Sequence, residues 1–348
     1  MNSKRCKGIL PRINIPSFPS RALAGRAVHP IGLGCMGMSE FYGAADEAES
    51  LATLHAALDL GIGHFDTADT YGLGHNEELL GRFLAQLPPG RRAGIVVATK
   101  FGIVRAPGRY ERRIDNSPAY IRSACDASLR RLGVEAIGLY YCHRRDASVP
   151  IEDVAGTLGD LVRAGKVRAI GFSEVSADSL RRAHAAHPVA ALQTEFSLWE
   201  RGAQAELLPL AAALGAAFVA YSPLGRGMLT GALPATDRLE AGDFRRALPR
   251  FNGDHGAANR ARVDALKALT ADWNVTPTQL ALAWLLHQAP HVLPIPGARR
   301  QTHLAQNAAA SVIGLDDAQL RSLSALFDGA EAGARYPDAG WAGIETRG

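Results

Sequence analysis

Short apolar runs recur along the chain and alternate with amphipathic segments, and this alternation limits the possible folds more than any other feature. We expect eight strands, at residues 31–34, 63–66, 95–100, 137–143, 169–173, 191–196, 217–221 and 292–296. Each run is short and almost continuously apolar, which is typical of parallel strands that are covered on both faces. The pattern predicts an α/β fold consisting of a single (β/α)8 TIM barrel.

Helix-terminal signals mark the segments between the strands. Ser117-Pro118 and Thr276-Pro277 each place a capping residue before a proline, which is favoured at the first helical position. Further helices are expected at residues 46–60, 154–162 and 317–327, and one is expected to begin near residue 301. A doubly wound sheet is the alternative fold. It would need a glycine-rich turn after the first strand, and the run GLGCMG at 32–37 lacks the third glycine at the required place.

The chain divides into a barrel and two flanking segments. Prolines at 11, 16 and 19 argue against a helix near the start, so residues 1–20 are predicted to form a flexible extension. The barrel is expected over 21–330, with a short hairpin at 21–28 closing its floor, and residues 331–348 are expected to form a tail. The longest irregular segment is predicted at 224–259, after the seventh strand, and loops of that length are usually functional or disordered.

Composition excludes several classes of protein. The chain has 348 residues, 47% of them hydrophobic and 21% charged, which is ordinary for a globular protein with a large core. A net charge of +4 does not predict nucleic-acid binding, and no apolar stretch approaches the ~20 residues of a membrane span. The four cysteines show no metal-binding spacing. We therefore expect a reduced, cytoplasmic protein with no metal site and a small-molecule partner; the oligomeric state stays open.

Polar residues follow the predicted strands at the same end. Asp66 ends the second strand, Lys100 the third and His143 the fourth, and Tyr71 lies in the loop after Asp66. The functional groups of such barrels lie at the C-terminal ends of the strands. A tyrosine is a useful proton donor when its pKa falls below the usual value of about 10, and a lysine held by a carboxylate would lower it. These residues predict a polar site at the mouth of the barrel.

Six segments together resemble the aldo-keto reductase family over about residues 31–327. They are FDTADTYG (65–72), VVATKFG (96–102), LYYCH (139–143), GFSEVS (171–176), AYSPLGRG (220–227) and LPIPGARR (293–300). The segment GMSEFYG (37–43) is similar to a bacterial and plant branch that reduces aldehydes, including pyridoxal-like ones. The resemblance implies reduction of aldehydes or ketones to alcohols with NADPH. It also implies that Tyr71 is the acid, that Lys100 and Asp66 tune it, and that His143 orients the carbonyl.

The resemblance further implies a cofactor site at the barrel mouth. Its expected residues are Gly34, Cys35, Met36, Asp66, Ser173, Glu174, Gln193, Tyr221, Ser222, Leu224, Gly225, Arg226, Gly297, Arg299, Arg300, Gln306 and Asn307. Tyr221 would stack on the nicotinamide ring. Arg299 and Arg300, before a helix N-terminus, would bind the 2′-phosphate. The substrate pocket is expected to include Phe41, Tyr42, Phe101 and Trp199, with Tyr110 and Phe244 as further candidate walls.

Two positions depart from the family pattern, and two other functions stay open. Cys142 precedes His143 where many relatives have Gln, and Glu174 follows Ser173 where many have Asn. A carboxylate at 174 can accept a hydrogen bond from the nicotinamide carboxamide but cannot donate one. The first alternative function is an NADP(H)-binding regulatory or sensing protein with little turnover. The second is a barrel isomerase or aldolase that uses Lys100 as a Schiff-base nucleophile.

Overall fold

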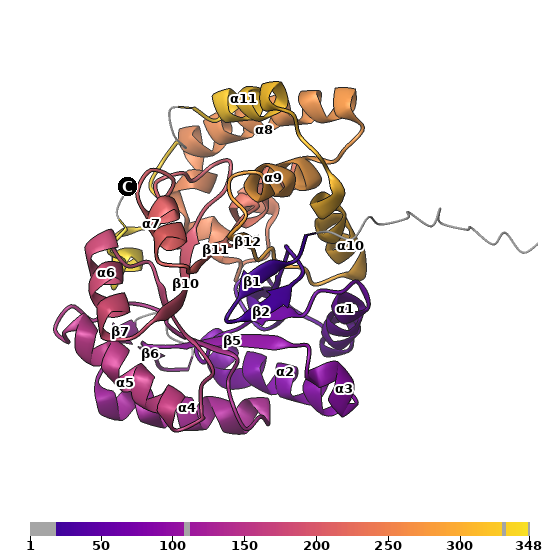
Figure 1. Cartoon of the computed structure of the whole chain (residues 1–348). Coiled ribbons are helices and arrows are strands. Elements are labelled where there is room, and N and C mark those ends of the chain that lie inside the picture. Colours follow the sequence, from indigo (N-terminus) through magenta and orange to yellow (C-terminus); the bar gives the residue numbers. More distant parts are fainter. Residues whose placement is uncertain (1–18, 108–111, 329–331, 347–348) are drawn as a thin grey trace, which may run out of the picture.

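Parallel strands curl into a closed barrel at the centre of the molecule (Figure 1). The computed structural model describes residues 19–107, 112–328 and 332–346. The barrel strands, in chain order, are β3 (Leu33–Gly34), β4 (His64–Asp66), β5 (Val96–Phe101), β8 (Leu139–Cys142), β9 (Ile170–Ser173), β10 (Val189–Glu195), β11 (Ala217–Tyr221) and β12 (Val292–Pro294). Each lies beside the strand before it in this order, and all pairs are parallel. The predicted barrel is confirmed.

The barrel closes between its first and last strands. The amides of Gly32 and Gly34 donate to the carbonyls of Pro294 and Pro296, at 3.0 and 3.2 Å. A Cβ atom at Gly34 would lie 2.8 Å from the carbonyl oxygen of Ile295, which is closer than real Cβ atoms come. Position 34 therefore requires glycine, because the backbones of the first and last strands approach each other directly at this position.

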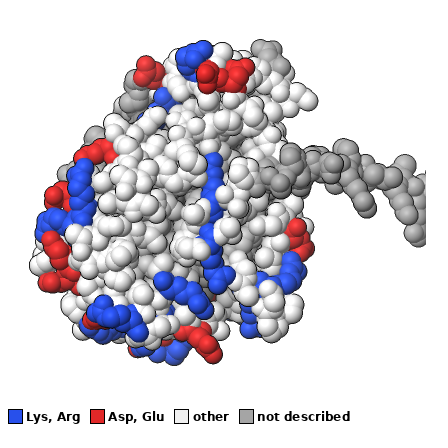
Figure 2. All heavy atoms as spheres, viewed as in Figure 1, with Lys and Arg blue, Asp and Glu red and all other residues white. Residues whose placement is uncertain are grey.

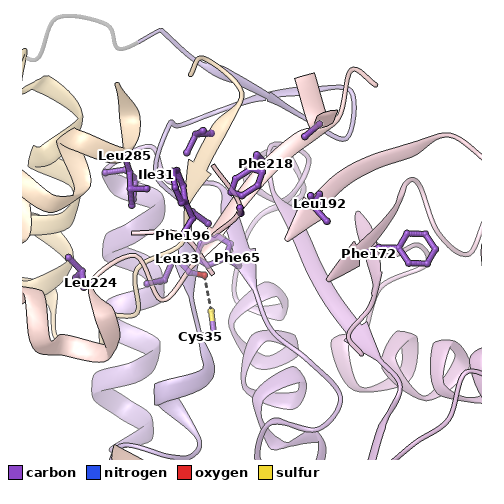
Figure 3. Packing of buried hydrophobic residues seen from close by; sticks show 14 of the residues in the cluster. Ile31, Leu33, Cys35, Phe65, Phe172, Leu192, Phe196, Phe218, Leu224 and Leu285 are labelled. Carbon is purple, nitrogen blue, oxygen red and sulfur yellow. Dashed lines mark hydrogen bonds between the residues drawn. The ribbon is translucent and has the colours of Figure 1, made fainter. Parts of the chain in front are cut away.

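Side chains alternate between the barrel interior and the layer of helices outside it, as the two-residue period of a strand requires. One apolar cluster fills the interior and includes Val96, Ala98 and Tyr141. Leu23 and Val28, from the hairpin of β1 (Arg21–Leu23) and β2 (Arg26–Val28), join it and close the floor as predicted. A larger cluster packs between strands and helices, and Figure 3 shows part of it. Its members from the strands include Leu33, Phe65, Phe172, Leu192 and Phe218.

The helices surround the barrel (Figure 1). They are α1 (Glu47–Asp59), α2 (His75–Ala85), α3 (Pro89–Arg92), α4 (Pro118–Leu132), α5 (Ile151–Arg163), α6 (Ala177–Ala186), α7 (Leu207–Ala213), α8 (Gly253–Trp273), α9 (Pro277–Leu286), α10 (Gln301–Ala309) and α11 (Asp317–Leu326). The predicted caps are present. The hydroxyl of Ser117 accepts from the amide of Tyr120 at 3.3 Å, and Thr276 forms a reciprocal capping box with Gln279.

The segment after β11 is less irregular than predicted. It contains four short 3-10 helices, η3 (Gly225–Thr230), η4 (Thr236–Arg238), η5 (Phe244–Ala247) and η6 (Pro249–Phe251). Helix α8 then begins at Gly253, inside the segment 224–259 that the sequence predicted to be irregular. Its sequence is rich in alanine and charged residues and has few large apolar ones, so the helical period is weak. A hairpin of β6 (Ile103–Arg105) and β7 (Arg112–Ile114) was also not predicted.

The two flanking segments differ in how far the structure describes them. Most of the predicted N-terminal extension, residues 1–18, lies outside the described residues. The part of the C-terminal tail that is described packs against the barrel, where Arg335, Tyr336 and Ile344 are buried. On the face in Figure 2, acidic and basic side chains lie around the edge and a short basic stripe crosses the middle. Within the described ranges, no helix is both long and apolar enough to cross a membrane.

His64 is buried inside the barrel and makes stability depend on pH. Neither of its ring nitrogens has a hydrogen-bond partner among the described residues, and burial lowers its pKa to about 4. The unfolded-state value is about 6.5, so the native state binds fewer protons between these values. The stability associated with the neutral ring is therefore fully present above pH 6.5 and is lost as the pH falls toward 4.

Replacing His64 by Gln should remove this pH dependence. Between pH 7.5 and pH 5, we expect the wild-type free energy of unfolding to fall by about 2 kcal/mol more than that of His64→Gln. Urea unfolding at the two pH values measures the difference. Equal losses in the two proteins would show that the ring is not held neutral.

Candidate active site

The C-terminal ends of three neighbouring strands bring the predicted polar residues together. Asp66, Lys100 and His143 lie at the ends of β4, β5 and β8, in the inward-facing phase of each strand. The Lys100 ammonium donates to the Asp66 carboxylate and, at 2.8 Å, to the carbonyl of Thr67. Its Nζ lies 5.2 Å from the ring centroid of Tyr71, and that centroid lies 5.8 Å from the ring centroid of His143. The four residues form one cluster.

The ion pair keeps Lys100 charged although its side chain is fully buried. Burial alone would lower the pKa of Lys100, but the charge of Asp66 and the nearby Tyr71 raise it above the ordinary value. For Tyr71, burial raises the pKa, whereas Lys100 lowers it through its charge and a hydrogen bond. The net pKa of Tyr71 is raised, because the effect of burial exceeds the lowering by Lys100 that the sequence predicted. The phenol therefore holds its proton at neutral pH, as a proton donor must.

His143 is a neutral imidazole in this setting. Burial lowers its pKa well below the usual range, and the positive charges of Arg144, Lys100 and Arg112 lower it further. A neutral ring has one N–H to donate and one nitrogen to accept. His143 lines the cavity beside Tyr71, so its ring can donate a hydrogen bond to an oxygen bound there.

Buried polar residues hold this cluster in place. The second carboxylate oxygen of Asp66 accepts from Gln193 Nε2 at 2.8 Å. Asn76, at the start of α2, accepts from the hydroxyl of Thr67 at 2.6 Å and donates to the carbonyl of Cys35 at 2.9 Å. These contacts connect the loops after β3 and β4, which fixes the backbone that carries Asp66.

A cavity of about 770 Å³ opens at the mouth of the barrel above this cluster. Most of the predicted cofactor residues line it: Gly34, Cys35, Met36, Asp66, Ser173, Gln193, Tyr221, Ser222, Leu224, Arg226, Gly297, Arg299, Arg300, Gln306 and Asn307. Seven arginines line its walls, whereas Asp66 supplies its only carboxylate among the described residues. Arg105, Arg226 and Arg245 pair with Glu40, Glu195 and Asp243, which lie outside the lining and partly balance these three charges. The remaining excess of arginine over carboxylate favours a negatively charged ligand.

One end of the cavity has the features of a phosphate and base site. Arg299 and Arg300 immediately precede α10, whose first amides point toward the cavity end of the helix. The Arg300 side chain is 67% exposed and is therefore accessible to a ligand. Asn307 is buried, and its Nδ2 has no hydrogen-bond partner in the described part of the chain. An unpaired buried donor that lines a cavity fits a base that offers an acceptor, so these residues suit the adenosine end of NADPH.

The loop that follows β11 forms the middle of the cavity. Ser222 and Arg226 have φ values of 48° and 54°, in the left-handed region that non-glycine residues rarely adopt. Such backbone strain persists only where the surrounding structure holds it, and it gathers at functional sites. Ser222, Leu224 and Arg226 line the cavity beside Tyr221, and their role in binding the pyrophosphate stays a prediction.

Two predicted cofactor residues do not line the cavity. Glu174 has a φ of 57°, and its side chain pairs with Arg335, with Nη2 3.0 Å from Oε2. The expected contact of Glu174 with the carboxamide is corrected, because this carboxylate turns away from Ser173 and the cavity. Gly225 belongs to the loop after β11 and faces Trp199, since a Cβ atom at Gly225 would come 2.5 Å from the Trp199 ring. Gly225 therefore permits close packing and does not face a ligand.

Two predicted walls of the substrate pocket are also wrong. Phe101 is fully buried, and its ring centroid lies 5.0 Å from that of Tyr140 in the layer outside the barrel. It follows the inward-facing Lys100 directly, so strand alternation points it outward. Trp199 is 4% exposed and packs under the loop with Phe251.

Three aromatic residues that the sequence predicted as walls of the substrate pocket do line the cavity. Phe41 and Tyr42 line the cavity as predicted, and Phe244 lines it too. The centroids of the Phe41 and Phe244 rings lie 5.7 Å apart, so residues far apart in sequence meet at this edge of the cavity. Tyr110 lies outside the described residues.

Several residues that line the cavity were not predicted from the sequence, and three of them make polar contacts that bear on the site. Arg144 donates to Ser173 Oγ at 3.1 Å, and Arg105 pairs with Glu40 at the edge near Tyr71. Arg144 follows His143 directly, and this position at a strand end could have revealed it. Tyr336 comes from the C-terminal tail, and no sequence signal indicated that the tail reaches the cavity.

The fold and this site define a barrel with a buried cluster of ionisable residues under an arginine-lined cavity. The family model described as "Aldo/keto reductase family" matches residues 30–328. This chain belongs to the aldo/keto reductase family, whose members are oxidoreductases. The resemblance found in the sequence is thereby confirmed.

Named relatives and solved structures agree with this assignment. The chain is 42% identical to the NADP(+) aldo-keto reductase yakc of Schizosaccharomyces pombe, over 92% of this chain and 95% of that protein. It is 43% identical to a probable aldo-keto reductase 1 of Glycine max, over 90% and 89%.

Among solved structures, a glycerol dehydrogenase from Gluconobacter oxydans matches with a TM-score of 0.79 and 30% identity, over 89% and 95% of the two chains. An aldo/keto reductase from Klebsiella pneumoniae, solved with NADP and acetate, matches with a TM-score of 0.69 and 27% identity, over 92% and 99%.

Proposed function

We propose that this protein reduces aldehydes or ketones to alcohols with NADPH. The observation that carries the proposal is the cluster of Tyr71, Lys100, Asp66 and His143 beneath a cavity whose far end presents Arg299 and Arg300. Family membership supports the reaction class. The name of the Schizosaccharomyces pombe relative and the NADP-bound Klebsiella pneumoniae structure support the cofactor.

Each residue of the cluster has a distinct task in this reaction. NADPH, when bound, supplies the hydride that reaches the carbonyl carbon. Tyr71 holds a proton at its hydroxyl and gives it to the carbonyl oxygen, and the neighbouring Lys100 ammonium stabilises the phenolate that remains. Asp66 keeps Lys100 charged and in position. The N–H of neutral His143 orients the carbonyl.

The aromatic residues at the cavity edge indicate the kind of carbonyl compound. Phe41, Tyr42 and Phe244 line the cavity near Tyr71, and aromatic walls favour flat or apolar substrates. The panel that tests the function therefore contains pyridoxal, a nitrobenzaldehyde, methylglyoxal and a simple ketone. NADPH consumption with at least one of them supports the proposal. Tight NADPH binding without consumption on any of them would favour the regulatory or sensing function.

The Schiff-base alternative is disfavoured by the state of Lys100. Its pKa is raised, and its ammonium donates to Asp66 and Thr67. A lysine nucleophile needs a neutral amine and hence a lowered pKa. Borohydride trapping of a carbonyl compound on Lys100 would overturn this conclusion.

Arg299 and Arg300 should decide the preference for NADPH over NADH. We expect Arg299→Ala/Arg300→Ala to weaken NADPH binding about 100-fold, as the loss of two charge-assisted contacts to a phosphate would, and NADH binding less than about threefold. Calorimetric titration with both cofactors measures this. A matched control, Arg122→Ala/Arg163→Ala, removes two exposed arginines that pair with Asp160 outside the cavity. Equal weakening of NADPH and NADH would refute the 2′-phosphate role.

A further inference from the structure

The described C-terminal segment, residues 332–346, packs against one side of the barrel mouth and contributes Tyr336 to the cavity. Figure 1 shows its yellow trace close to α6, which lies about 150 residues earlier in the chain, although α11 directly precedes the segment. The amide of Ser176, the cap of α6, donates to the Glu345 carboxylate at 2.8 Å, and the amide of Arg145 donates to the carbonyl of Gly343 at 2.9 Å. The amide of Glu345 also donates to the backbone carbonyl of Glu174 at 2.9 Å. The segment is therefore tied to the ends of β8 and β9.

A buried ion pair anchors this segment. Glu174 is fully buried and Arg335 is 4% exposed. The guanidinium donates to both oxygens of Glu174, at 3.0 and 3.3 Å, and one nitrogen lies 3.8 Å from Glu195. The hydroxyl of Thr346 donates to Glu174 as well. Buried charges with this many partners are costly to separate, so the backbone at Arg335 is held firmly.

The next residue, Tyr336, connects this anchor to the cavity. Its hydroxyl accepts from Arg226 Nη2 at 2.6 Å and lies 3.3 Å from the hydroxyl of Tyr221. Trp341 packs edge-on against its ring at 5.7 Å and donates to its carbonyl at 3.2 Å. Tyr336, Tyr221 and Arg226 all line the cavity. Two residues of the cofactor site thus take a hydrogen-bond partner from the C-terminal segment.

We propose that Tyr336, fixed by the Arg335–Glu174 pair, is a positioning residue for the nicotinamide end of the cofactor site, a role that rests on the proposed function. Its hydroxyl holds the ring of Tyr221, on which the nicotinamide stacks, and the guanidinium of Arg226. Glu174 does not contact the cofactor in this proposal and acts indirectly, because its carboxylate holds Arg335, the neighbour of Tyr336. At the adenosine end, Arg299 donates to the carbonyl of Ala44 and Arg300 pairs with Glu49, and among the described residues no hydrogen bond or ion pair links Arg299, Arg300 or Asn307 to this segment.

Two ligands separate this role from a purely structural one. NADPH occupies both ends of the site, whereas adenosine 2′,5′-bisphosphate carries the adenosine, its 2′-phosphate and the first phosphate of the pyrophosphate but lacks the nicotinamide half. Tyr336→Phe removes the contacts of the hydroxyl with Arg226 and Tyr221. We expect the Kd of NADPH to rise about fivefold and the Kd of the bisphosphate to change less than twofold. Calorimetric titration gives both constants. Tyr120→Phe, which removes a hydroxyl outside the cavity, is the matched control and should leave both unchanged.

A second variant tests the anchor. Arg335→Lys keeps the charge but loses the two-pronged contact with Glu174, and we expect the same selective weakening of NADPH. If Arg335→Lys fails to fold, the two dissociation constants of Tyr336→Phe alone test the positioning role. Unchanged binding of both ligands by Tyr336→Phe, or equal weakening of both, would overturn the positioning role. A wild-type protein that binds the bisphosphate and NADPH equally well would also contradict it. A wild-type protein that binds neither ligand would instead overturn the proposed function, and the positioning role with it.

Discussion

Tyr71→Phe is expected to lower kcat about 1000-fold and to change the Kd of NADPH less than twofold. The substitution removes the hydroxyl that gives its proton to the carbonyl oxygen and leaves the ring in place beside His143. General acid catalysis contributes about 100- to 10,000-fold, so the loss should fall in this range. Steady-state turnover of the best substrate of the panel gives kcat, and titration gives the Kd.

Tyr140→Phe is the control that tests whether replacing any buried tyrosine by phenylalanine lowers kcat. The hydroxyl of Tyr140 is buried outside the barrel and has no partner among the described residues. Tyr140→Phe should therefore keep kcat within twofold and leave stability unchanged or slightly higher, because it removes an unsatisfied group. Near-normal turnover in Tyr71→Phe would rule out Tyr71 as the acid.

Asp66→Asn is expected to be the most destabilising single change in the site. It leaves the fully buried Lys100 ammonium without its carboxylate, and breaking a buried pair in this way costs about 3 kcal/mol or more. The pKa of Lys100 should fall, since the charge of Asp66 raises it, and the phenolate of Tyr71 would lose its stabilising cation. We expect kcat to drop at least 100-fold in addition to the loss of stability.

Urea unfolding and turnover of the same preparations measure both effects. The control is Asp160→Asn, which breaks exposed ion pairs with Arg122 and Arg163 and should cost less than about 1 kcal/mol. A loss in Asp66→Asn no larger than in this control would show that the pair does not carry the stability of the site. Unchanged turnover would contradict the role of Asp66 in holding Lys100.

Periodicity and strand ends were sufficient to predict the barrel and to indicate its acid–base cluster. Apolar runs covered on both faces require helices on the outside, and Asp66, Lys100 and His143 each interrupt such a run at the same end. The same alternation excludes Phe101 from the pocket, because Lys100 before it faces inward. The outward orientation of Phe101 could therefore have been predicted from its place in the strand.

Glu174 is a different case. Its partner Arg335 lies 161 positions further along the chain, in a segment that carries no helical or strand pattern. The backbone at Glu174 is left-handed and directs its carboxylate away from the cavity. This conformation could not be predicted either, because glutamate rarely adopts it. Only the folded chain shows that this position anchors the C-terminal segment, and that Tyr336 thereby enters the cavity.

The most direct test of the proposed function is a single turnover of NADPH bound to the protein. Rapid mixing of the protein–NADPH complex with the best aldehyde of the panel should oxidise one equivalent of NADPH per cavity and form one equivalent of alcohol. With Tyr71→Phe, the bound NADPH should be oxidised at least 100-fold more slowly. Bound NADPH that stays reduced in the wild-type protein with every carbonyl compound tested would contradict the proposed function.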